Sequence, residues 1–111
     1  MTTTLITGAT GGFGPVLAKH LSSKGHRLLL HARNSSKLHN LCSKLEDHQH
    51  LTFSANPLIS NSAANEMCEL ILAQNALPNI IIHHLGGTQG VKSALASVEQ
   101  WLTVLTLNVF F

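Results

Sequence analysis

The sequence of 111 residues contains no tyrosine, and only 11% of its residues are charged. Seven basic residues and five acidic residues give a net charge of +2, and the basic residues form no run of the kind that binds nucleic acid. The longest uninterrupted apolar run is 70–73, far shorter than the roughly 20 residues that span a bilayer. We therefore expect neither a nucleic-acid partner nor a membrane segment.

Cysteine is also scarce. Cys42 and Cys68 are too few for a disulfide framework and too widely spaced for a metal knuckle, so we expect both to be reduced and half-buried. The first residues run directly into a structural motif, without the pattern of a secretory signal. These features lead us to expect a cytoplasmic protein.

The eight histidines do not form a metal-binding pattern. His83 and His84 are adjacent at the end of an expected strand, where neighbouring side chains point to opposite faces. His48 and His50 can share a face, but two ligands do not close a metal site. We expect no bound metal.

Hydrophobic residues make up 44% of the chain, enough for one folded domain over 1–111. Short apolar runs alternate with longer stretches of helical spacing, which is typical of an α/β fold. The expected strands are 3–7, 27–32, 51–55 and 79–83. We expect them to form a doubly wound parallel sheet in the order 3-2-1-4, with helices on both faces.

Apolar spacing predicts a helix after each strand. The stripes expected to face the sheet are Phe13, Val16, Leu17 and Leu21, then Leu38, Leu41 and Leu45, then Ala63, Met67, Leu70 and Ile71. The second helix is expected to open at one of the cap residues 34–36, and the last at a capping box of Ser97 and Gln100. Because the last helix has no stop signal before residue 111, we expect the fold to continue further, so that these residues are its N-terminal half.

A glycine-rich segment, TGATGGFG at 7–14, joins the first strand to the first helix. Gly8 permits a tight turn, Gly11 and Gly12 allow a bound group to approach the backbone, and Gly14 lets the helix start against the strand. The backbone N–H groups at the helix start favour an anion such as a pyrophosphate. The simpler alternative is a turn that binds nothing.

The spacing T-G-x-x-x-G-x-G, together with the strands that follow, resembles the short-chain dehydrogenase/reductase family. The resemblance runs from residue 3 to about residue 111. It implies the N-terminal half of a Rossmann-type fold that binds NAD or NADP and passes hydride between the nicotinamide and a small carbonyl or alcohol substrate. It also implies that Thr7, Gly8, Gly11, Gly12, Phe13 and Gly14 contact the cofactor. We further expect a homo-oligomer.

The end of the second strand favours NADP over NAD. An NAD site would place an acid about 20 residues past the glycine loop to bind the ribose hydroxyls, and Ala32 supplies none. Arg33 offers a planar cation that suits a 2′-phosphate. Alternatively, Arg33 is only a solvated charge at a strand end.

Three more positions take their expected roles from the resemblance. Asn56 stands where the family often has an aspartate that touches the adenine, and Gly86 is expected to border the cofactor. His83 and His84 replace the asparagine pair that is common after the fourth strand, which changes the polar network there. Asn108 matches an asparagine of the family's catalytic group.

The rest of that catalytic group is missing from the 111 residues. The family uses a serine and a Tyr-x-x-x-Lys pair, in which the tyrosine acts as general acid or base. Since the chain has no tyrosine, we expect these residues alone to be inactive in hydride transfer. The alternative function is a non-catalytic dinucleotide-binding or protein-interaction module that docks through the edge of the fourth strand and the last helix.

Overall fold

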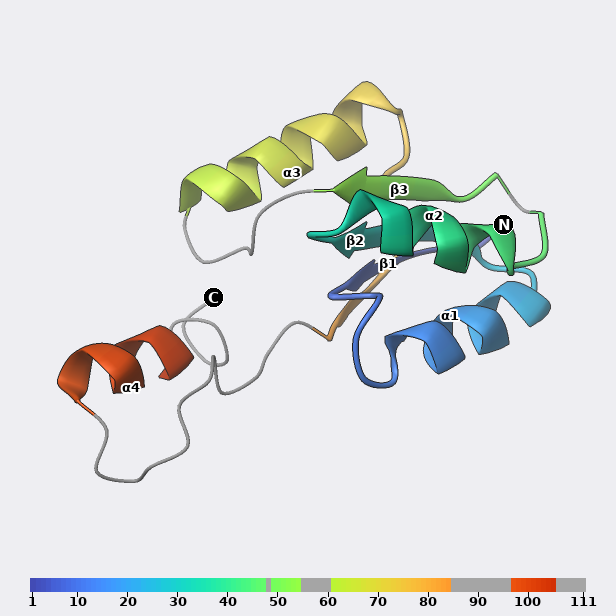
Figure 1. Ribbon diagram of the computed structural model, residues 1–111. Helices are drawn as coiled ribbons and strands as arrows, with labels where there is room; N and C mark the ends of the chain where they lie inside the picture. The colour runs from blue at the N-terminus through green and yellow to red at the C-terminus, as the bar shows by residue number, and fades with distance from the viewer. Residues whose placement is uncertain (48, 55–60, 85–96, 106–111) are drawn as a thin grey trace.

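A computed structural model describes residues 1–47, 49–54, 61–84 and 97–105. Four strands form one parallel sheet in the order β3-β2-β1-β4 (Figure 1). Their bounds are β1 (Thr3–Thr7), β2 (Arg27–Ala32), β3 (Leu51–Ser54) and β4 (Ile80–His83). The predicted strand order is confirmed, and the strand limits agree with the sequence to within one residue.

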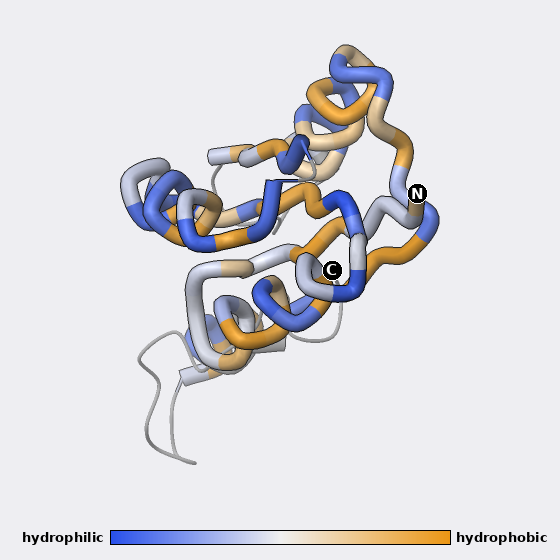
Figure 2. The backbone as a smooth tube through the Cα atoms, turned by 90° about the vertical axis from the view of Figure 1, so that its right-hand side faces the viewer, coloured by the Kyte–Doolittle hydropathy of each residue, from blue (hydrophilic) through white to orange (hydrophobic). Residues whose placement is uncertain are grey.

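Four helices connect or follow these strands in the described residues. They are α1 (Gly14–Ser23), α2 (Ser35–Ser43), α3 (Asn61–Ala73) and α4 (Val98–Leu105). Their coils carry alternating hydrophobic and hydrophilic segments (Figure 2), as amphipathic helices do. In Figure 1, α4 lies apart from the sheet, while α1, α2 and α3 lie against it.

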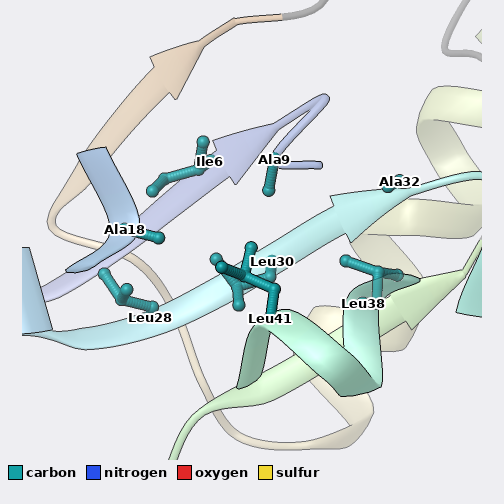
Figure 3. Packing of buried hydrophobic residues seen from close by; sticks show 8 residues of the cluster. All are labelled: Ile6, Ala9, Ala18, Leu28, Leu30, Ala32, Leu38 and Leu41. Carbon is teal, nitrogen blue, oxygen red and sulfur yellow. The ribbon is translucent and has the colours of Figure 1, made fainter. Parts of the chain in front are cut away.

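Two hydrophobic clusters cover the two faces of the sheet. Helices α1 and α2 pack on one face, where Ile6 and Leu30 are fully buried together with Ala18 and Leu38 (Figure 3). Helix α3 packs on the other face, and its cluster comprises Leu5, Leu29, Phe53, Met67, Ile71 and Ala76. The alternation of side chains along β1 and β2 divides the residues between the two clusters, as parallel strands covered on both sides require.

Two predicted helix starts are confirmed by their hydrogen bonds. The side chain of Asn34 accepts a bond of 3.0 Å from the backbone N–H of Lys37 at the start of α2. At α4, the backbone N–H of Ser97 donates to Gln100 Oε1 at 3.0 Å, and the N–H of Gln100 donates to Ser97 Oγ at 3.2 Å. The two reciprocal hydrogen bonds between Ser97 and Gln100 form the capping box predicted from the sequence.

The stripe predicted for α1 was wrong in part. Phe13 is 79% exposed and Val16 is 68% exposed, whereas the buried residues of the helix are Gly14, Ala18 and Ser22. These small residues recur every four positions, so the helix can lie close to the sheet along them. Large apolar side chains at 13 and 16 are thereby turned toward solvent.

Three further expectations about burial were wrong. Leu70 is 44% exposed, because α3 turns Met67 and Ile71 to the sheet instead. Cys68, on the same helix, is exposed. Cys42 is half-buried as expected. The burial of Cys42, together with the nearby Asp47 carboxylate, raises the pKa of the Cys42 thiol. Strand β4 was expected to be covered on both faces, but Ile80 and Ile81 remain exposed among the described residues.

Candidate functional site

The glycine-rich segment lies at the carboxyl end of β1, between β2 and β4. The chain leaves β1 toward β2, and β4 later adds to the other side of β1. This is the point where the strand order reverses, and in open parallel sheets ligands bind outside the carboxyl ends of the strands at such a point. The position of the loop therefore marks the place where a ligand site is expected.

Two glycines of the loop have backbone φ angles that residues with a side chain rarely adopt. Gly8 has a φ of 63° and Gly12 has a φ of 52°, both in the left-handed region that favours glycine. The backbone N–H of Ala9 donates to the His31 carbonyl oxygen at 2.9 Å, and the N–H of Gly14 donates to the Gly11 carbonyl oxygen at 2.9 Å. The loop is thus held in a defined turn next to the end of β2.

Gly14 is needed for a different reason, namely space. A Cβ atom at this position would lie 2.6 Å from the carbonyl carbon of Ala9, closer than real Cβ atoms approach. Ala9 itself is fully buried and points into the core beside Ile6 (Figure 3). By contrast, a Cβ atom on Gly11 would meet nothing within 4 Å, so the described residues do not require glycine there.

The start of α1 is suited to an anion. Phe13 takes the N-cap position without a side-chain hydrogen bond, and the first turn holds no acidic residue. Backbone N–H groups at a helix start carry a partial positive charge and need partners, which an anion can supply. The loop therefore presents donors where the sequence placed a pyrophosphate.

Strand β4 and the residue that follows it add two histidines to the site. The backbone N–H of His84 donates to Thr7 Oγ1 at 3.1 Å, and His83 Nδ1 lies 3.0 Å from the same oxygen. His84 Nδ1 lies 3.1 Å from the carbonyl oxygen of Gly8, to which it donates. Sequence reasoning noted that the histidines change the polar network but did not foresee a ring that contacts the glycine loop, because that contact depends on how β4 pairs with β1.

Arg33 follows β2 at the same edge of the sheet as the glycine loop. Its side chain is exposed, and Ser54 Oγ donates a hydrogen bond of 2.9 Å to its backbone carbonyl oxygen. The preceding Ala32 is 5% exposed and has no polar side-chain atom. The strand end thus offers a cation and no carboxylate, as the sequence indicated.

A basic pocket of about 200 Å³ lies between α1 and α2 beside the loop. Three of the seven Lys and Arg residues of the chain line it. The lining residues are Thr10, Pro15, Lys19, Lys37, Asn40, Leu41 and Lys44. These lysines are scattered in the sequence, so sequence reasoning missed their convergence; only the seven-residue spacing of Lys37 and Lys44 could have suggested a shared helix face.

Several predicted site residues cannot be placed. Asn56, Gly86 and Asn108 lie outside the described residues. Within the described ranges, no group of three or more potential metal ligands comes together. Among the helices of those ranges, none has the length and apolar character that crossing a membrane requires.

A parallel sheet with a glycine-rich turn at its switch point defines a Rossmann-type fold. A model of the short chain dehydrogenase family matches residues 2–110, nearly the whole sequence. The chain belongs to this family, which confirms the resemblance read from its motifs.

Individual relatives support the same assignment. The NADPH-dependent pterin aldehyde reductase of Arabidopsis thaliana is 35% identical over 109 residues, which cover 96% of this chain and 45% of that protein. The NADP-dependent 3-hydroxy acid dehydrogenase of Escherichia coli K12 is 31% identical over 106 residues, covering 94% of this chain and 42% of that protein. The chain thus spans less than half the length of these relatives.

A solved structure shows the same fold. The serine dehydrogenase of Escherichia coli superimposes with a TM-score of 0.81 at 27% identity, covering 98% of this chain and 50% of the other. The chain therefore shares its Rossmann-type fold with this solved structure.

Proposed function

We propose that residues 1–111 bind NADP(H) and form the cofactor-binding part of a short-chain dehydrogenase/reductase. The observation that carries this proposal is the glycine loop at the switch point of the sheet, with Gly8 and Gly12 at positive φ and Gly14 pressed against Ala9. A cradle that only glycine can form, followed by an open helix start, fits the pyrophosphate of a dinucleotide.

The roles of the loop residues follow from this geometry. Thr7 joins the loop to β4 through its hydroxyl group, and Gly8 and Gly12 shape the turn. Gly14 already donates its N–H to the Gly11 carbonyl oxygen and Pro15 has no N–H, so the backbone donors for the phosphate oxygens would be those of neighbouring residues such as Phe13 and Val16. Gly11 would leave the backbone accessible, since nothing lies within 4 Å of the position of its Cβ atom.

We favour NADP over NAD for two reasons. Arg33 is an exposed cation at the end of β2, and Ala32 cannot bind free ribose hydroxyls. The lysine-lined pocket beside Thr10 adds positive charge next to the loop. The relatives from Arabidopsis thaliana and Escherichia coli carry NADPH or NADP in their names, which agrees with this choice.

The nicotinamide cofactor would donate hydride to a small carbonyl substrate or accept it from a small alcohol substrate. The residues of this chain would bind and orient the cofactor, with Asn56 at the adenine and Gly86 along its path. Asn108 would belong to the catalytic group. Because the 111 residues contain no tyrosine, we expect no hydride transfer from them alone, so that nicotinamide absorbance stays constant with a panel of aldehydes and ketones.

A second candidate function is a non-catalytic dinucleotide-binding or interaction module. It is favoured by an open apolar groove of about 530 Å³ between α3 and β4, lined by Met67, Ile71, Leu77 and Ile81 among others. Ile81 is 63% exposed there. A partner, including a second copy in a homo-oligomer, would cover such a surface. A cytoplasmic location fits either function.

The proposed function is tested by equilibrium binding of NADP⁺ and NAD⁺ to the purified protein, measured by calorimetry. We expect binding of both, with NADP⁺ the tighter, and loss of both in Gly12→Val, whose side chain would be strained at the positive φ of Gly12 and would meet the His84 ring beside the proposed pyrophosphate site. Circular dichroism establishes that the variant is folded. If Gly12→Val folds and binds both cofactors normally, the loop is a structural turn only, and the proposed function is contradicted.

A further inference from the structure

His84 brings an imidazole ring to the glycine loop itself. Its Nδ1 lies 3.1 Å from the carbonyl oxygen of Gly8, at the start of the loop. A carbonyl oxygen only accepts, so Nδ1 must carry the hydrogen of this bond. The ring is therefore held in one orientation, and its other nitrogen, Nε2, is free to take a second role.

The far side of the ring borders Gly12. A Cβ atom built on Gly12 would lie 3.1 Å from His84 Cε1 and 3.3 Å from His84 Nε2. Gly12 is the second glycine of the T-G-x-x-x-G-x-G motif. In a dinucleotide site, the missing side chain of the second motif glycine lets the pyrophosphate reach the backbone. Nε2 of His84 thus lies at the edge of the space that the proposed ligand would enter.

The charge of the ring then matters for an anion. In the neutral ring with hydrogen on Nδ1, Nε2 carries a lone pair and would face phosphate oxygens that also carry lone pairs. In the protonated ring, both nitrogens donate, and Nε2 would form a charge-assisted hydrogen bond to a phosphate oxygen. Imidazole is the side chain that changes between these two states near neutral pH.

Among the described residues, the titratable side chains placed near the loop are a histidine and lysines. His83, on β4, shares Thr7 with His84 and is the one other titratable side chain with a contact to the loop described above. From α1, Lys19 lines the separate pocket beside Thr10. The acidic residues of the chain all lie outside the segments that meet the ring, at positions 46, 47, 66, 69 and 99.

From this geometry we propose that His84 is a binding residue for the dinucleotide and that binding is coupled to protonation of its ring. The inference rests on the proposed function, since it assumes a dinucleotide on the glycine loop. It gives a chemical role to one of the two histidines at the carboxyl end of β4. Affinity for the anion should rise as the pH falls, because the proton that binding requires becomes easier to supply.

The test is calorimetry of NADP⁺ binding near neutral pH in two buffers of different ionisation enthalpy, which reports the protons taken up per ligand bound. The variant His84→Asn keeps an amide that can donate to Gly8 but cannot be protonated. Because the 2′-phosphate of NADP⁺ itself titrates near pH 6, the difference between parent and variant is the quantity of interest. His20→Asn, at the opposite end of α1, is the matched control.

We expect the parent and His20→Asn to take up more protons than His84→Asn. We also expect the parent's affinity to rise between pH 8 and pH 6 by about ten-fold more than that of His84→Asn, the scale of one charge-assisted hydrogen bond. Equal proton uptake in parent and His84→Asn would overturn the inference while leaving dinucleotide binding intact. Absence of binding at every pH would instead overturn the proposed function, and the inference with it.

A second measurement needs no variant. Nitrogen NMR of the imidazole rings distinguishes a nitrogen with a lone pair from one with a hydrogen. We expect the His84 Nε2 signal of the parent to move from the first kind toward the second when NADP⁺ is added to saturation. A signal that keeps its lone-pair position in the complex would contradict the proposal even if His84→Asn failed to fold.

Discussion

Gly14 and Ala9 approach so closely that a Cβ atom on Gly14 would lie 2.6 Å from the carbonyl carbon of Ala9. The contact fixes the start of α1 against the end of β1 and thereby sets the shape of the whole loop. Because Ala9 is fully buried, it cannot move aside without disturbing the core beneath α1.

Gly14→Ala should therefore destabilise the protein by about 1–3 kcal/mol, the usual cost of forcing extra volume into a packed site. Gly11→Ala is the matched control, since a Cβ atom there meets nothing within 4 Å. Urea denaturation followed by circular dichroism measures both. Equal stability of the two variants would contradict the close packing at Gly14.

Arg33→Ala should distinguish the two cofactors. Loss of the guanidinium removes a charge-assisted pair with the 2′-phosphate, so affinity for NADP⁺ should fall about ten-fold or more, while affinity for NAD⁺ changes little. Calorimetry of both ligands with parent and variant measures this. Arg27→Ala, at the opposite end of β2, is the control. Parallel losses for NADP⁺ and NAD⁺ would refute the role of Arg33 in cofactor choice.

His50 is expected to support the fold rather than the site. Its Nδ1 accepts a bond of 2.8 Å from the backbone N–H of Leu28, and its Nε2 donates to the Glu46 carbonyl oxygen at 2.6 Å. His50→Ala removes the partner of a backbone donor on a fully buried residue, which should lower the free energy of unfolding by about 1–3 kcal/mol. His39→Ala, on the exposed side of α2, should change it by less than about 0.5 kcal/mol. A similar change in both would count against this role.

The apolar groove between α3 and β4 should promote self-association. Ile81 is 63% exposed within it, and Leu72 also lines it with an exposed side chain. We expect light scattering to show association of the parent protein and a shift toward monomer in Ile81→Lys. Val16→Lys places the same charge at an exposed apolar position on α1 and should not have this effect. A monomeric parent at high concentration would contradict the expectation.

Much of the fold was predictable because it depends on local patterns. The strands follow apolar runs, the order of the sheet follows from short right-handed connections, and the starts of α2 and α4 follow from Asn34 and the Ser97 capping box. The glycine loop was predictable for the same reason, since its spacing and its place between strand and helix are both local.

The rest depends on contacts between distant segments. Phe13 and Val16 fit a helical stripe, but the small residues of α1 decide which side faces the sheet. The ring of His84 reaches Gly12 only because β4 pairs with β1. Likewise, Lys19 and Lys37 share a pocket only because α1 and α2 lie side by side on one face.

The central claim is that a dinucleotide binds on the glycine loop at the end of β1. Backbone amide NMR of the parent protein during titration with NADP⁺ tests it most directly. We expect the largest chemical-shift changes in residues 8–14 and in His84, with little change at Met67 and Ile71 on the opposite face of the sheet. Shifts confined to α3, or no shifts at saturating NADP⁺, would contradict the claim.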